Sequence, residues 1–203
     1  MSETAVLDAA ETLFYGRGIQ AVGMDDIRAT SGVSLKRLYR LFPSKEALVV
    51  AYLERRDERW RARMREYVDR HEGTRVLLVF DWLYLWFTEP GFRGCAFINS
   101  YGEMGTTSPA VMRVVRHHQD ELSGYVTSLH PGLGEQVMLL VDGAITIAAI
   151  GGDPDAAKRA KAAAAVLVSA HGQGRGGAGG GGPHGAALQP GPGVLPGPGR
   201  DQA

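Results

Sequence analysis

Apolar residues along most of this chain recur at the spacing of an α-helix, and that periodicity constrains the fold more than any other feature. In segment 3–15, for example, Val6, Ala10 and Leu13 belong to one apolar stripe at helical spacing. Proline and glycine are too sparse before residue 170 to divide the chain into short strands. The pattern therefore predicts an all-α protein with about nine helices.

Capping and breaking residues set the predicted helix boundaries. Ser34 and Ser44 are suited to cap helix N-termini, and Pro43 stops the helix that precedes it. The predicted helices span 3–15, 24–30, 35–41, 45–71, 74–88, 95–104, 109–129, 135–150 and 154–170. Gly, Pro, Ala and Gln dominate from residue 171 onward, and such a segment cannot bury enough apolar surface to offset its chain entropy. We therefore expect residues 171–203 to form a disordered tail.

Positive charge is concentrated in one short region, although the formal net charge of the chain is zero. Between residues 28 and 45 the charged side chains are all basic: Arg28, Lys36, Arg37, Arg40 and Lys45. A local basic face is what DNA binding requires. The alternative is a solvated helix surface without a partner.

Segment 27–42 has the pattern of a helix, a turn and a second helix. The second helix has an apolar face of Leu35, Leu38, Tyr39 and Phe42, and a basic face of Lys36, Arg37 and Arg40. One face is expected to pack on the protein, while the other offers three cations to the major groove of B-DNA. The N-terminus of this helix, at Ser34, suits a phosphate group.

The stretch ATSGVSLKRLYRLFPSKEAL, residues 29–48, closely resembles the DNA-binding motif of TetR-type bacterial transcriptional repressors. The likeness covers about residues 6–48. It implies a dimer with a three-helix DNA-binding domain at 1–47 and a larger helical ligand-sensing and dimerisation domain at 48–170. Resemblance and geometry together predict DNA contacts, with Arg40 as a base reader, from Ser34, Lys36, Arg37, Tyr39, Arg40 and Lys45.

The resemblance is incomplete at three positions. Many TetR-type repressors have threonine where this chain has Arg37, and histidine or tyrosine where it has Leu41. Gly23 stands where threonine or serine usually opens the second helix. These departures bear on which operator sequence is read, and they leave the expectation of DNA binding unchanged.

Aromatic and buried polar residues suggest a ligand pocket in the second domain. The tentative contacts are Trp82, Trp86, Cys95, Asn99, Glu103 and His118. Cys95, Asn99 and Glu103 repeat at i, i+4 and i+8, while His118 interrupts an apolar helix face. The aromatic residues equally fit an ordinary helical core, and His118 fits a core hydrogen bond better than a ligand anchor. For Cys95, inert packing is favoured over a redox sensor.

Small residues in the last two predicted helices allow close helix packing. They are Gly143, Ala144, Ala148, Ala160, Ala163 and Ala164. Two such helices from each of two subunits would make a four-helix interface between identical chains. Packing within one chain is the alternative, and the sequence does not separate the two.

No sequence pattern indicates catalysis, a cofactor or a metal. His117 and His118 are adjacent and cannot share one helix face, and there is no nucleophile elbow or Gly-rich phosphate loop. Segment 2–11 is polar, and the apolar run 76–87 is too short to span a membrane, which predicts a cytoplasmic protein without a membrane partner.

The expected function is a non-enzymatic, ligand-responsive transcriptional regulator. As a homodimeric repressor it would bind a palindromic double-stranded operator and be released by a small-molecule effector. The alternative is a helical-bundle enzyme or carrier for small molecules, which would use Cys95, Glu103 and His118.

Overall fold

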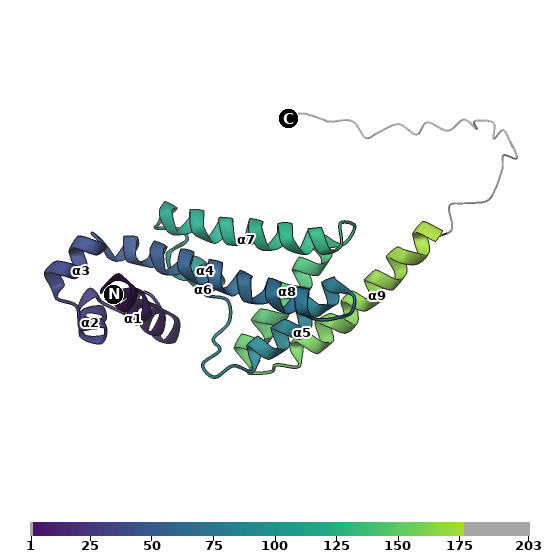
Figure 1. Cartoon of the computed structure of the whole chain (residues 1–203), viewed down its shortest axis with the longest axis horizontal. Coiled ribbons are helices and arrows are strands. Elements are labelled where there is room, and N and C mark those ends of the chain that lie inside the picture. The colour runs from purple at the N-terminus through teal and green to yellow at the C-terminus, as the bar shows by residue number, and fades with distance from the viewer. Residues whose placement is uncertain (1, 177–203) are drawn as a thin grey trace, which may run out of the picture.

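The computed structural model describes residues 2–176, and all regular secondary structure in this range is helical (Figure 1). Its nine helices are α1 (Ser2–Arg17), α2 (Met24–Ser31), α3 (Leu35–Leu41), α4 (Lys45–Arg70), α5 (Arg75–Phe87), α6 (Ala96–Met104), α7 (Pro109–Leu129), α8 (Gly134–Gly151) and α9 (Ala156–Gly176). The predicted all-α fold is confirmed. Helix α9 continues past residue 170, where we expected it to end, and the rest of the predicted tail lies outside the described residues.

The first three helices form a small unit at one end of the molecule (Figure 1). Val6, Phe14 and Leu38 are buried in its core, which is closed by α4. Helix α2 ends at Gly32, whose φ of 67° lies in the left-handed region where a side chain would be strained. This sharp turn allows α3 to leave α2 at an angle and present its outer face to solvent.

Helix α4 connects this unit to the rest of the protein. Near its start, Leu48 and Tyr52 are buried, and the Tyr52 ring lies 5.8 Å from that of Phe14 in α1. Farther along, Trp60 and Met64 are buried in the second part of the core, where α4 packs against α5 and α7. One helix therefore contacts both parts of the protein.

Helices α5, α8 and α9 pack together at the other end (Figure 1). The Asp81 carboxylate on α5 accepts hydrogen bonds from Lys161 Nζ on α9 at 2.6 and 2.7 Å. Six small residues of the last two helices were expected to pack either within one chain or between two. Four of them are buried within this chain, which favours packing within one chain: Ala144, Ala148, Ala160 and Ala164. Gly143 is half-buried and Ala163 is exposed.

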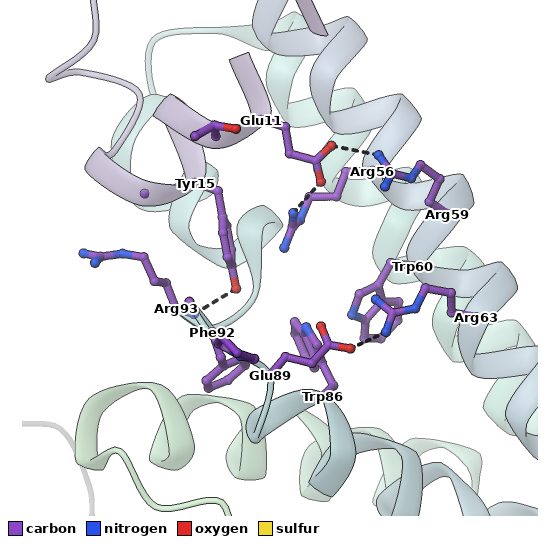
Figure 2. A pocket seen from close by; sticks show the side chains of 14 residues that line it. Glu11, Tyr15, Arg56, Arg59, Trp60, Arg63, Trp86, Glu89, Phe92 and Arg93 are labelled. Carbon is purple, nitrogen blue, oxygen red and sulfur yellow. Dashed lines mark hydrogen bonds and ion pairs between the residues drawn. The ribbon is translucent and has the colours of Figure 1, made fainter. Parts of the chain in front are cut away.

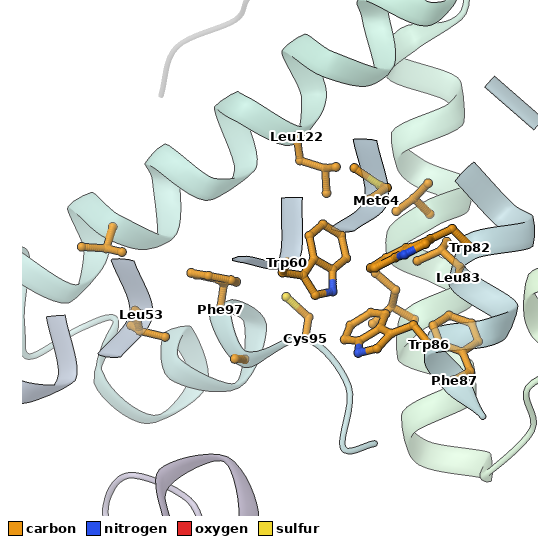
Figure 3. Packing of buried hydrophobic residues seen from close by; sticks show 14 of the residues in the cluster. Leu53, Trp60, Met64, Trp82, Leu83, Trp86, Phe87, Cys95, Phe97 and Leu122 are labelled. Carbon is orange, nitrogen blue, oxygen red and sulfur yellow. The ribbon is translucent and has the colours of Figure 1, made fainter. Parts of the chain in front are cut away.

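Aromatic rings fill the centre of the second part (Figure 3). Trp60 meets Trp82 and Trp86 edge to face, with ring centroids 4.8 and 5.2 Å apart. Such edge-to-face pairs add about 0.5–1.5 kcal/mol each beyond the burial of their surface. The cluster fixes how α4 and α5 pack against one another.

Helix α8 is the one described helix that is long and apolar enough to cross a membrane by length and composition. It also packs against α7, α9 and α5. A core helix of a folded domain has the same properties. Three of its apolar side chains, Leu139, Ile147 and Ile150, are nonetheless exposed.

Candidate nucleic-acid interface

Helix α3 carries the predicted basic face at the outer end of the N-terminal unit (Figure 1). Lys36, Arg37 and Arg40 are all exposed on it. Within residues 2–176, no ion pair is formed by Lys36, Arg40 or Lys45. Arg28, by contrast, pairs with Asp25 at 3.3 Å. Cations without acidic partners are available to bind the phosphates of a nucleic acid.

Arg37 is exposed but has a hydrogen-bond partner in the protein. Its guanidinium donates to Ser2 Oγ at the start of α1, at 2.8 and 3.2 Å. These bonds join the N-terminus of α1 to the basic face of α3. A phosphate that binds Arg37 would compete with Ser2.

The prediction that four apolar residues of α3 form one buried face is only half correct. Leu38 and Phe42 are buried, but Leu35 is 40% exposed and Tyr39 is 46% exposed. A seven-residue helix on a unit this small has room to bury one or two of its positions, so Leu35 and Tyr39 remain at the surface. Both side chains therefore lie on the solvent-exposed part of the helix, together with the three cations.

Hydroxyl caps hold the two helix starts that flank this face. Ser34 Oγ accepts from the backbone N–H of Arg37 at 3.4 Å, and Ser44 Oγ accepts from that of Ala47 at 3.0 Å. Capping of this kind contributes roughly 1 kcal/mol per helix end. The caps position Lys45, the first residue of α4, near the end of α3.

Gly23 precedes α2 and cannot cap it with a side chain. Its backbone N–H instead donates to the Asp26 carboxylate at 2.8 Å. This hydrogen bond is the main cause that lowers the pKa of Asp26. This bond is one half of a capping box, and the other half, in which a serine or threonine side chain accepts from a backbone N–H of the first turn, is missing at Gly23.

The six tentative ligand contacts do not surround one cavity. Asn99 and Glu103 line a cleft of about 160 Å³ against α1. Trp86, Cys95 and His118 border a void of about 10 Å³, too small for an organic ligand. Trp82 lines neither of these spaces and faces a third depression beside α4.

His118 has a protein partner in the core. It is 3% exposed, and its Nδ1 lies 2.6 Å from Oδ1 of Asp57, which also binds Arg61. Its ring stacks on Phe97 at 3.7 Å. Burial alone would raise the pKa of Asp57, but the hydrogen bonds from His118 and Arg61 outweigh it and lower the pKa to about 2. These contacts favour a structural role for His118.

Cys95 is buried at the start of α6 and belongs to the packed aromatic region (Figure 3). Burial raises the pKa of its thiol to about 11. The reactive thiolate is therefore scarce at neutral pH. This environment favours inert packing over redox sensing.

Glu103 belongs to a set of contacts that joins the N-terminal unit to the second part of the protein. Its carboxylate accepts from the backbone N–H of Gln20 at 2.7 Å. Tyr15 Oη donates to the carbonyl of Gly94 and accepts from the backbone N–H of Arg93, both at 2.9 Å. A third link joins Ser108 Oγ to Glu46.

Sequence reasoning missed Tyr15 and Asp57, and only Asp57 had a visible signal. Asp57 lies between Leu53 and Trp60 on the apolar face of α4, where a carboxylate needs a buried partner. The links of Tyr15 join positions that are 78 and 79 residues apart, so no local pattern marks them. Among residues 2–176 no group of three or more His, Cys, Asp or Glu side chains could hold a metal ion.

Comparison with protein families gives a match over the N-terminal unit. Residues 6–52 match the family of bacterial regulatory proteins of the tetR type. Two HTH-type transcriptional regulators from strains of Mycobacterium tuberculosis are each 46% identical over 54 residues. That match spans only 27% of this chain and 27% of each relative's length.

Solved structures extend the likeness to most of the chain. A TetR-family transcriptional regulator from Streptomyces coelicolor is 30% identical, with a TM-score of 0.72 over 79% of this chain and 90% of its own. A TetR-type regulator from Streptomyces avermitilis is 27% identical, with a TM-score of 0.68 over 76% and 90% of the two chains. The reduced form of Escherichia coli NemR is 20% identical, covers 80% and 95%, and with a TM-score of 0.71 shares the fold.

The structural likeness to the Streptomyces coelicolor regulator covers nearly all of that protein. The same chain has the basic, outward-facing α3 and the long α4. The family match falls on the same three helices and the start of α4. The chain belongs to the TetR family of bacterial transcriptional regulators, which bind DNA through an N-terminal helix-turn-helix domain.

Proposed function

We propose that this regulator is a repressor that binds a palindromic operator as a homodimer and is released by a small-molecule effector. The observation that carries the proposal is the exposed basic face of α3, whose Lys36 and Arg40 have no acidic partner among the described residues. Residues 1–47 would bind DNA, while residues 48–170 would sense the effector and dimerise. This role requires the cytoplasm, where operator DNA is found.

The proposed DNA contacts follow from where the side chains lie. Arg40 and Lys36 would reach base edges or phosphates in the major groove, since both project from the exposed side of α3. Tyr39 is exposed beside them, and its hydroxyl, which has no hydrogen-bond partner among residues 2–176, would donate to a phosphate. Ser34 and Lys45 would bind phosphates on either side of the groove, and Arg37 would do so after leaving Ser2.

The proposed dimer uses the exposed apolar side chains of the last two helices. Ile150 on α8 is 85% exposed, and Val166 on α9 is 69% exposed. Exposed apolar side chains that gather on one surface mark protein–protein interaction sites. A second copy, related by a two-fold axis, would pack on this surface and form a four-helix interface. The two α3 helices of the dimer would then be placed to enter successive major grooves of DNA.

Release would proceed through the contacts between the two parts of the protein. Three contacts connect α6 and its neighbours to the DNA-binding helices. They join Gln20 to Glu103, Tyr15 to the loop before α6, and Glu46 to Ser108. An effector that displaces these partners would change the position of α3 in each subunit. It needs only to favour the non-binding arrangement by a few kcal/mol.

Selection of bound duplexes from random DNA tests the proposal. The purified chain should enrich an inverted repeat whose half-site centres lie about 34–36 Å apart, or a multiple of that. A matched duplex with one half-site inverted serves as the control and should bind more weakly. Recovery of no preferred sequence, or of one without two-fold symmetry, would contradict the proposal.

The alternative of a helical-bundle enzyme or carrier receives less support. It would need Cys95, Glu103 and His118 together, but Glu103 binds Gln20 and His118 binds Asp57. The thiol of Cys95 is buried and its pKa is raised. No described cavity brings the three side chains together.

A further inference from the structure

A pocket borders the aromatic core at the junction between the two parts of the protein. It has a volume of about 540 Å³ and is bordered by α1, α4 and the segment between α5 and α6 (Figure 2). Its walls combine charged and aromatic side chains: Glu11, Tyr15, Arg56, Arg59, Trp60, Arg63, Trp86, Glu89, Phe92 and Arg93. That volume is within the range of pockets that bind small molecules.

Positive charge is in excess around this pocket. Four arginines face two glutamates, Glu11 and Glu89, which leaves two positive charges uncompensated. The Glu11 carboxylate is moreover shared, because Arg55, Arg56 and Arg59 all donate to it at 2.9–3.0 Å. Arg63 pairs with Glu89, and Arg93 has no acidic partner within residues 2–176. An excess of guanidinium groups favours an anionic occupant.

The remaining wall is aromatic. Trp86 and Phe92 meet edge to face with ring centroids 5.0 Å apart, and Trp60 stands beside them (Figure 2). Trp60 is 7% exposed, and its indole Nε1 has no hydrogen-bond partner in the described part of the chain. The occupant should thus carry an apolar or aromatic body as well as its charge.

We propose that this junction pocket is the effector site and that it takes an amphipathic organic anion, in chemical class an aryl or alkyl carboxylate. The carboxylate would bind at the mouth, to Arg63 on one side and to Arg93, whose exposed side chain would turn inward from the opposite side (Figure 2). The apolar body would lie on Trp60, Trp86 and Phe92. The regulatory consequence rests on the proposed function, while the binding itself does not.

The position of the pocket explains how its occupant would reach the DNA-binding helices. Tyr15 forms part of the wall and also links α1 to Arg93 and Gly94. The Arg56 guanidinium lies 3.8 Å above the Tyr15 ring, and it also binds Glu11 on α1. A carboxylate that binds Arg93 would pull on the segment whose backbone N–H donates to Tyr15, so α1 would shift relative to α4.

Intrinsic fluorescence tests the site without DNA. The chain has three tryptophans, of which Trp60 and Trp86 line the pocket, and Trp82 stacks on Trp86 at 5.7 Å. The probes are phenylacetate, phenylbutyrate and phenylhexanoate, each compared with its matched alcohol on the full chain. We expect at least one acid to change the emission with a Kd at least about tenfold lower than that of its alcohol, as a charge-assisted bond implies. Equal binding of acids and alcohols, or no binding by any probe, would overturn the proposal.

Paired variants locate the anion. The double variant Arg63→Gln with Arg93→Gln should weaken acid binding at least about tenfold and leave alcohol binding unchanged. The control is Arg113→Gln with Arg116→Gln, which removes the same charge from exposed positions on α7. All four side chains are exposed or at the pocket mouth, so folding should be retained, and circular dichroism checks this. Acid binding reduced equally in both double variants would show a general charge effect and reject the site.

A separate measurement on DNA distinguishes this proposal from the repressor role. If the chain selects no operator, the repressor role fails, but the fluorescence result still decides whether the anion site exists. If the wild-type chain binds both operator and acid, the acid should release the DNA from it and not from the Arg63→Gln with Arg93→Gln variant. Undiminished DNA binding at saturating acid would reject the pocket as the effector site.

Discussion

His118, Asp57 and Arg61 form a charged network inside a helical core. The Asp57 carboxylate accepts from Arg61 at 2.6 and 2.8 Å and lies 2.6 Å from His118 Nδ1, while Glu121 binds the other side of Arg61 at 2.8 Å. A buried carboxylate is tolerated only with such partners, and removal of one partner from a buried pair is costly. This network ties α4 to α7 at the centre of the protein.

The Asp57 network predicts a pH dependence of stability. The pKa of Asp57 falls from 3.8 to about 2 in the folded chain, so its ionised form favours folding above about pH 4. That contribution, about 2 kcal/mol, is lost as pH falls from about 4 to 2. The Asp57→Asn variant should lack this component and be less stable by about 3 kcal/mol at neutral pH. Urea unfolding at a series of pH values measures both, and identical pH profiles for the two proteins would contradict the assignment.

Residue-scale prediction from the sequence succeeded for the exposed cations of α3, but it failed for Leu35 and Tyr39, which are exposed, and for the partners of buried polar groups. The cations of α3 were correctly expected on an exposed face, because their spacing opposes that of Leu38 and Phe42. The bond between His118 and Asp57 joins residues 61 positions apart, and only the folded chain reveals it. For the same reason Glu103, expected to face a ligand, lies in the cleft beside α1 and binds Gln20.

The helices themselves were predictable because their boundaries depend on local chemistry. Ser34, Ser44 and Ser108 each cap the helix that follows, and Gly32 ends α2 in the left-handed conformation. These signals act within one turn, so they are readable in the sequence. The junction pocket was not predictable, since α1, α4 and the segment before α6 contribute its walls from three distant parts of the chain.

Removing the Tyr15 hydroxyl should loosen the link between α1 and the segment before α6. In Tyr15→Phe, the Gly94 carbonyl and the Arg93 N–H both lose a partner, which should lower the free energy of unfolding by about 1–2 kcal/mol. The matched control is Tyr39→Phe, because that side chain is exposed on α3. Chemical denaturation compares the two, and equal stabilities would show that the link contributes nothing.

The whole molecule places its DNA-binding helices at one end, while α8 and α9, which carry the exposed Leu139, Ile150 and Val166, lie toward the other (Figure 1). The long α4 joins these ends, and the junction pocket lies along it. In this arrangement the proposed dimer at α8 and α9 would set the separation of two α3 helices. A change at the junction would then alter that separation without disrupting the dimer.

The proposed dimer predicts a specific response to charge on its surface. The double variant Ile150→Glu with Val166→Glu should sediment as a monomer in analytical ultracentrifugation, because the four buried carboxylates of a dimer would be unpaired. A control, Ile98→Glu on α6, changes an exposed apolar residue away from α8 and α9 and should leave the dimer intact. Sedimentation of the double variant as a dimer would exclude this surface.

The central claim is that the exposed cations of α3 read DNA, and one affinity measurement tests it most directly. On the duplex recovered by selection, fluorescence anisotropy should show Lys36→Ala and Arg40→Ala each weakened by about tenfold or more, with unchanged circular dichroism. Arg116→Ala on α7 removes the same charge elsewhere and should bind as the wild-type chain does. Wild-type affinity in both α3 variants would contradict the account.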